Sequence, residues 1–146
     1  MVDQVSKKLK KLQPKEGEGS KTIRVLYVED AAVIRDTISR LLGLSGYEVA
    51  YAKNGKEGLE MALRWKPDLV LMDLRMPVMD GYEAINQLKL HAQTRNIPVF
   101  VVSAWSGKKE RNQAKLAGAD EFFEKPPDLH RLISAIEKAV AASKKK

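Results

Sequence analysis

Short apolar runs and amphipathic stretches alternate along most of the chain. Runs rich in β-branched and aromatic residues occur at 23–28, 47–51, 68–72, 97–102 and 121–124. Apolar residues recur at helical spacing over the intervening and following stretches, 31–44, 54–65, 81–90, 107–117 and 129–140. The run at 68–72 is nearly all apolar between turn residues, which is typical of a strand buried on both faces.

Five strands separated by helices predict repeated right-handed crossovers and an α/β fold with a mostly parallel sheet. The common five-strand solution is the flavodoxin-like doubly wound (βα)5 sandwich, with strand order 2-1-3-4-5. Its switch point lies between strands one and three, and ligands bind outside the carboxyl ends of the strands there. The residues after 23–28 and after 68–72 are therefore predicted to share one crevice.

Acidic residues follow both of these strands. Glu29 and Asp30 come after the first strand, and Asp73 comes after the third. Three converging carboxylates repel one another unless a cation lies between them, and oxygen ligands without nearby His or Cys favour Mg²⁺ or Mn²⁺. An alternative role for Asp30 is the N-cap of the helix predicted from Ala31, and the two roles are compatible.

Two further strand ends carry a hydroxyl and an ammonium group. Ser103 follows the fourth strand, and Lys125 ends the fifth strand directly before Pro126. Lysine can hold a phosphoryl oxygen as a point charge, and Pro126 could turn Lys125 inward through a cis peptide bond. With a divalent cation, these groups predict covalent phosphorylation, in which the Asp73 carboxylate attacks phosphorus.

Residues 23–142 resemble the receiver domain of two-component response regulators. The motifs that carry the resemblance are Val28-Glu29-Asp30, Asp73 through Gly81, Val102-Ser103-Ala104, and Gly118 through Pro126. The resemblance implies that Asp73 accepts a phosphoryl group from a histidine kinase or phosphotransfer protein. It also implies that Asp30, Asp73 and the backbone carbonyl of Arg75 bind Mg²⁺, with Glu29 acting through water.

The resemblance further implies a conformational switch. Ser103 would move to bond the phosphoryl group, Phe122 would turn inward, and the surface formed by 107–117, 121–124 and the last helix would bind a downstream protein partner. A dimer linked to phosphorylation is a further expectation. Arg75 and Trp105, two residues beyond Asp73 and Ser103, are hypothesised to limit the access of water to the phosphoryl group.

Other classes of function are less well supported by the sequence. An aspartyl phosphohydrolase would carry a second acid two residues after its nucleophile, where this chain has Arg75. We therefore expect self-phosphorylation and slow self-dephosphorylation rather than enzymatic turnover. No DNA-reading motif is evident, so specific DNA binding is not expected. A receiver excised from a hybrid histidine kinase or a larger multidomain regulator is the alternative.

Positive charge is concentrated at the two ends of the chain. The 146 residues carry a net charge of +7, of which 1–22 contribute +3 and the last three lysines +3. We divide the chain into a basic tail or linker (1–22), a receiver domain (23–142) and a lysine tail (143–146). Val2, Val5, Leu9 and Leu12 are spaced as on one face of a helix. The chain has no cysteine, and it has no apolar run long enough for a membrane span or signal peptide, which predicts a cytoplasmic protein.

Overall fold

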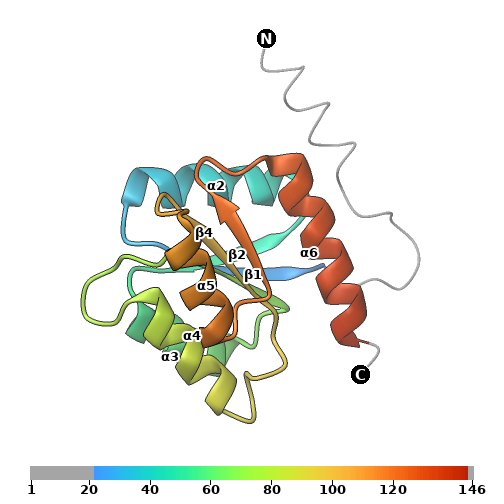
Figure 1. Ribbon diagram of the computed structural model, residues 1–146. Coiled ribbons are helices and arrows are strands. Elements are labelled where there is room, and N and C mark those ends of the chain that lie inside the picture. The colour runs from blue at the N-terminus through green and yellow to red at the C-terminus, as the bar shows by residue number, and fades with distance from the viewer. Residues whose placement is uncertain (1–21, 145–146) are drawn as a thin grey trace.

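A central parallel sheet lies between two layers of helices in the computed structural model, which describes residues 22–144 (Figure 1). The strands run in the order β2-β1-β3-β4-β5, which confirms the predicted flavodoxin-like fold. The elements are β1 (Arg24–Val28), α2 (Ala32–Leu44), β2 (Glu48–Ala52), α3 (Gly55–Trp65), β3 (Leu69–Met72), α4 (Gly81–Leu90), β4 (Val99–Ser103), α5 (Lys108–Ala117), β5 (Glu121–Glu124) and α6 (Leu129–Lys144).

Alternate residues of the strands build one apolar layer on each face of the sheet. The layer under α2 and α6 includes Tyr27 of β1 and Phe100 of β4. The layer under α3, α4 and α5 includes Val28 of β1 and Met72 of β3. All four residues of β3 are fully buried, as the apolar run at 68–72 predicted. The strand that directly precedes Asp73 is therefore anchored on both faces by apolar packing.

Several element boundaries differ by one or two residues from the sequence prediction. β2 begins at Glu48 rather than at residue 47, and β4 begins at Val99 rather than at residue 97. Ile97 lies in a turn, because its N–H donates to the carbonyl of Thr94 at 3.0 Å. These shifts leave the order of the elements unchanged.

The start of α2 corrects one prediction. Its N-cap is Ala31, which makes no side-chain cap hydrogen bond, so the N-cap role proposed for Asp30 is wrong. The helix begins at Ala32, one residue later than predicted, so Asp30 precedes the N-cap position instead of occupying it. By contrast, Asn54 and Asp80 cap α3 and α4 through their side chains. The Asp30 carboxylate is exposed at the carboxyl end of the sheet.

The loop between β3 and α4 lies tightly against the end of β3. Gly81 donates its N–H to the carbonyl of Leu74 at 2.9 Å. A Cβ atom at Gly81 would lie 2.1 Å from the carbonyl oxygen of Asp73, so only glycine fits there without a shift of the backbone. The start of α4 is thereby clamped onto the backbone that carries Asp73.

The two tails fall largely outside the described residues. The predictions of a helical segment and a linker within 1–21 are not addressed by the structure. Residues 145–146 of the predicted lysine tail also lie outside it, although α6 itself continues to Lys144. Between residues 22 and 144, no helix is long and apolar enough to cross a membrane.

Candidate functional site

The ends of β1 and β3 bring three carboxylates together. One oxygen each of Glu29, Asp30 and Asp73 lies within 4.8 Å of the others. The two strands are neighbours, and the N–H of Asp73 donates to the carbonyl of Val28 at 3.0 Å. Glu29 and Asp73 are buried whereas Asp30 is exposed, so the cluster is reached from solvent on the side of Asp30.

Lys125 supplies a positive charge to this cluster from the end of β5. Its ammonium group donates to Oε1 of Glu29 and lies 3.4 Å from Oδ1 of Asp73. The backbone N–H of Lys125 donates to the carbonyl of Ser103 at 3.0 Å, which holds the ends of β4 and β5 together. The Lys125–Pro126 peptide bond is cis, the isomer expected from the sequence. The ammonium therefore lies between two buried carboxylates.

The two buried acids differ in their affinity for protons. Burial and the neighbouring Glu29 raise the pKa of Asp73 to about 7, against the opposing effects of Lys125 and the N–H of Leu74. Burial would also raise the pKa of Glu29, but hydrogen bonds from Lys125 and Asp73 outweigh it and lower that pKa. A cation among the carboxylates would favour the ionised form of Asp73.

The donor set of the cluster fits a hard divalent cation. Its three residues offer only carboxylate oxygens, the ligands that Mg²⁺ prefers, and no described His or Cys belongs to the group. Mg²⁺ is usually held by one or two carboxylates together with waters and phosphate oxygens. The predicted contribution of the Arg75 carbonyl stays a prediction.

Ser103 lies at the carboxyl end of β4, and Phe122 lies on the neighbouring strand β5. Ser103 is fully buried, and its hydroxyl accepts the N–H of Trp105 at 3.0 Å, which forms a local turn. The N-cap of α5 is Gly107, so Ser103 does not cap that helix. Phe122 is half-buried against the apolar layer under α5, with the guanidinium of Arg111 4.6 Å from its ring centroid. The proposed movement of both side chains stays a prediction.

Arg75 and Trp105 contact each other beside the acids. The guanidinium of Arg75 lies 4.3 Å from the centroid of the Trp105 ring, in cation–π geometry. The two residues belong to the loops that follow β3 and β4, so their stacking links the backbone segments after Asp73 and Ser103. The sequence singled out both positions, but only the structure shows that they form a pair.

Two residues that the sequence analysis missed contact Glu29. The hydroxyl of Tyr27 donates to Oε1 of Glu29 at 3.2 Å, and the guanidinium of Arg35 donates to its backbone carbonyl at 3.1 Å. Alternation along β1 could have indicated Tyr27, because residues two apart on a strand point to the same face. We see no comparable signal for Arg35, a buried arginine on α2 that stacks on Tyr51.

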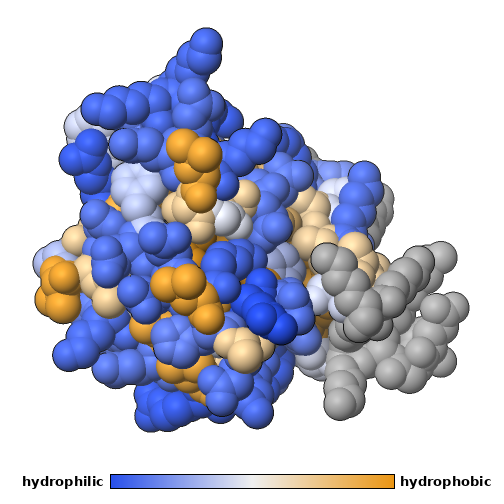
Figure 2. Space-filling model, turned by 60° about the horizontal axis from the view of Figure 1, so that its bottom comes forward, coloured by the Kyte–Doolittle hydropathy of each residue, from blue (hydrophilic) through white to orange (hydrophobic). Residues whose placement is uncertain are grey.

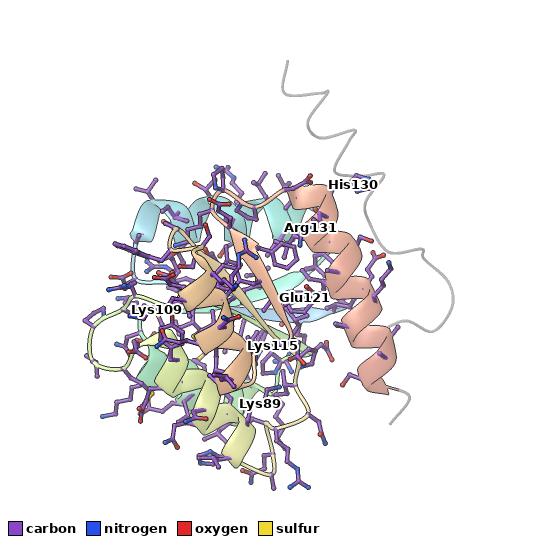
Figure 3. All side chains as sticks on the ribbon, in the orientation of Figure 1. Lys89, Lys109, Lys115, Glu121, His130 and Arg131 are labelled. Carbon is purple, nitrogen blue, oxygen red and sulfur yellow. The ribbon has the colours of Figure 1, made fainter. Side chains whose placement is uncertain are left out.

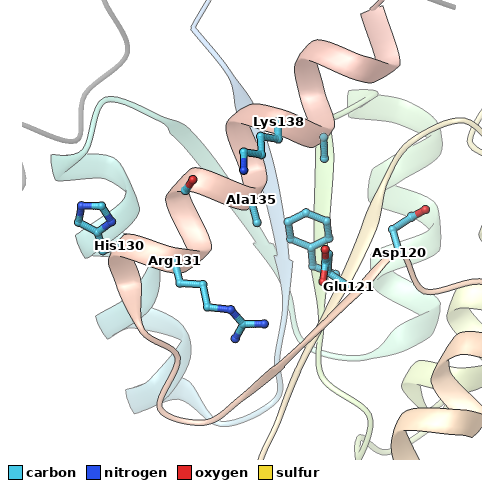
Figure 4. A pocket seen from close by; sticks show the side chains of 9 residues that line it. Asp120, Glu121, His130, Arg131, Ala135 and Lys138 are labelled. Carbon is cyan, nitrogen blue, oxygen red and sulfur yellow. The ribbon is translucent and has the colours of Figure 1, made fainter.

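The surface formed by α5, β5 and α6 is polar and hollowed. A pocket of about 520 Å³ lies between β5 and α6, with Glu121, Arg131 and Lys138 among its lining residues (Figure 4). Lys109 and Lys115 extend the positive charge over α5 (Figure 3). In Figure 2, hydrophobic side chains form separate spots on a largely hydrophilic face. A partner of the pocket between β5 and α6 would meet charged groups of both signs.

Comparisons with known proteins point to one protein family. The model of the response regulator receiver domain family matches residues 25–137. The transcriptional regulatory protein PdtaR of Mycobacterium tuberculosis is 41% identical over 119 residues, 81% of this chain and 57% of the relative. Protein PilH of Pseudomonas aeruginosa is 34% identical over 118 residues, 81% of this chain and 98% of the relative.

A solved structure with the same fold contains a metal ion. The receiver domain of sensor histidine kinase PA1611 from Pseudomonas aeruginosa, with a magnesium ion coordinated in its active-site cleft, is 27% identical. The TM-score is 0.78, and the match covers 83% of this chain and 99% of that one. The chain spans about half the length of PdtaR and of several other curated relatives that it matches.

Proposed function

Because this chain belongs to the response regulator receiver family of two-component systems, we propose that Asp73 accepts a phosphoryl group from a histidine kinase or phosphotransfer protein. The observation that carries the proposal is the position of Lys125, whose ammonium contacts Glu29 and lies 3.4 Å from Asp73. A buried carboxylate with a raised pKa beside an ammonium group and two further acids is typical of functional sites, and this arrangement supports the proposed chemistry on a phosphoryl group.

In the proposed step, a carboxylate oxygen of Asp73 attacks phosphorus. The phosphorus–nitrogen bond of the donor phosphohistidine breaks, its electron pair returns to the imidazole, and an acyl phosphate forms on Asp73. Lys125 lies close enough to Asp73 to stabilise charge on a phosphoryl oxygen as the bond forms. Hydrolysis of the acyl phosphate by water would return the carboxylate and release inorganic phosphate.

Mg²⁺, or Mn²⁺ in its place, is the cation that we assign to the site. Asp30, Asp73 and the carbonyl of Arg75 would hold it, and Glu29 would act through a water molecule. When bound, the ion would neutralise charge on the phosphoryl oxygens. The magnesium ion in the related PA1611 receiver domain supports this assignment.

The output that we propose is a change in the conformation of the face formed by α5, β5 and α6. Ser103 would bond the phosphoryl group, Phe122 would turn inward, and the face formed by α5, β5 and α6 would then bind a downstream protein, as a monomer or as a phosphorylation-linked dimer. The phosphoryl group can shift this equilibrium only by as much as it binds one state better than the other.

We propose no enzymatic turnover and no specific DNA contact for the receiver. A receiver cut from a hybrid kinase would share this chemistry.

The proposal is tested by intact mass after incubation with Mg²⁺ and a small-molecule phosphodonor. The native chain should gain one phosphoryl group, whereas Asp73→Asn should gain none, because the amide is not a nucleophile. EDTA should also prevent labelling. Asp68→Asn is the matched control, since Asp68 lies at the opposite end of the same strand and accepts the N–H of Arg24. Labelling of Asp73→Asn, or no labelling of the native chain by any of a panel of kinases, would refute the proposal.

The Arg75–Trp105 pair is predicted to lengthen the life of the phosphorylated state. Replacing both residues with alanine should give water easier access to the phosphoryl group. We expect the aspartyl-phosphate lifetime to fall about 2- to 5-fold, the factor that corresponds to the roughly 0.5–1 kcal/mol of an exposed cation–π pair. Lifetimes are measured by loss of the phosphorylated mass after the donor is removed.

The control for this prediction is a second arginine–tryptophan pair. Arg24 lies 4.1 Å from the ring centroid of Trp65, near the opposite ends of the strands, so Arg24→Ala should leave the lifetime unchanged. Equal lifetimes for the native chain and the double variant would show that the pair does not shield the phosphoryl group.

A further inference from the structure

Glu29 is almost completely buried, and hydrogen bonds reach both of its carboxylate oxygens. Its exposed fraction is 1%. Oε2 accepts the backbone N–H of Ala31 at 3.3 Å, whereas Oε1 accepts both the ammonium of Lys125 and the hydroxyl of Tyr27. A buried carboxylate needs such partners, because an unpaired one is strongly disfavoured. Lys125 and Tyr27 donate through their side chains, whereas Ala31 donates through its backbone.

These two side-chain donors differ in what else they can do. Lys125 also lies 3.4 Å from Asp73, and its ammonium is the group that we assign to a phosphoryl oxygen. The hydroxyl of Tyr27 donates to Glu29 at 3.2 Å. Its ring is fully buried in the apolar layer under α2 and α6, which limits the directions in which the hydroxyl can point.

We propose that Tyr27 is a positioning residue of the phosphoacceptor site, whose hydroxyl holds the Glu29 carboxylate in place for the cation, both before phosphorylation and when Lys125 turns to the phosphoryl group. The proposal deepens the proposed function and rests on it. Glutamate has one more rotatable bond than aspartate, so its carboxylate needs more restraint to stay beside Asp73. A fixed hydroxyl on the same strand face provides that restraint through β1 itself, without depending on the loops around the site.

The test is a titration with Mg²⁺ in the absence of any phosphodonor, followed calorimetrically. Tyr27→Phe removes only the hydroxyl and should weaken Mg²⁺ binding about 3- to 10-fold. This loss is smaller than the factor of about 10–100 typical for partners of direct ligands, because Glu29 is assigned a role through water. In a Glu29→Gln background, Tyr27→Phe should have no further effect, since the carboxylate that it positions is gone.

Tyr47→Phe is the matched control. Tyr47 is buried in the same apolar layer, but its hydroxyl lies near Glu137 on α6 rather than near the three acids. Its removal should leave the Mg²⁺ affinity unchanged, which separates positioning from a general loss of core stability.

Three results of the titrations with variants would overturn the proposal. These are native affinity in Tyr27→Phe, an equal loss of affinity with and without the Glu29 carboxylate, or an equal loss in Tyr47→Phe. Fluorotyrosine labelling of the native chain gives a second measurement that does not require a variant to fold. One of its four tyrosine resonances should shift with the midpoint of the Mg²⁺ titration, and no shift would also overturn the proposal.

Failure of the proposed function would be distinguishable from failure of this inference. If the native chain accepts no phosphoryl group but Tyr27→Phe still weakens Mg²⁺ binding through Glu29, the role of Tyr27 stands and the role of Asp73 falls. If the native chain binds no Mg²⁺, both fall.

Discussion

Lys125→Met is expected to destabilise the metal-free protein by about 3 kcal/mol at pH 8 and to slow phosphoryl acceptance about 100-fold or more. Methionine has a similar length but no charge, so Glu29 and Asp73 would be left as buried acids without their ammonium partner. The destabilisation should shrink at lower pH, because the two acids can then take up protons. Urea unfolding in EDTA measures the first effect, and the rate of mass gain with a phosphodonor measures the second.

Two further variants make this prediction specific. Lys125→Arg keeps the charge and should lose much less stability, although the planar guanidinium fits a site built for a compact ammonium less well. Glu29→Gln combined with Lys125→Met removes one carboxylate along with the ammonium and should recover part of the loss in stability. A native-like unfolding free energy in Lys125→Met alone would mean that the ion pair adds little to the fold.

Asp73→Asn is expected to stabilise the metal-free protein by about 2 kcal/mol above pH 7 and to flatten its dependence on pH. The folded-state pKa of Asp73 is raised to about 7 from 3.8, so between these values the folded protein binds more protons than the unfolded chain. Stability therefore falls as the pH rises from about 4 through about 7. The full shift corresponds to about 4 kcal/mol, and we expect roughly half of it because the pKa of Glu29 shifts in the opposite direction.

The measurement is urea unfolding at pH 5 and pH 8, with EDTA present. The difference between Asp73→Asn and the native chain should be small at pH 5 and large at pH 8, and excess Mg²⁺ should narrow it by stabilising the native chain. Parallel profiles for the two proteins would show that Asp73 does not titrate in this range.

The strand order and the meeting of the acids could both be predicted from the sequence. Each strand is a short run with β-type composition between turn residues, and right-handed crossovers leave few ways to arrange five of them. Once the order is known, Glu29, Asp30 and Asp73 must meet, because they directly follow two neighbouring strands. Backbone geometry alone therefore places the candidate site.

Helix starts and side-chain contacts were less predictable. The sequence allowed Asp30 to cap α2, but the helix begins one residue later, with Ala31 as its N-cap. Such a difference depends on local backbone dihedrals, which residue type biases only weakly.

What the sequence by itself determined is the fold and the set of acids at its switch point, because both follow from periodicity and strand ends. Only the tertiary structure decided which donors surround Glu29 and which residue stacks on Trp105. Lys125 is 96 residues from Glu29 along the chain, and the hydroxyl of Tyr27 reaches Glu29 only because the core holds its ring. Arg75 meets Trp105 through the fold of two separate loops. Contacts of this kind depend on side-chain packing, which no local pattern in the sequence records.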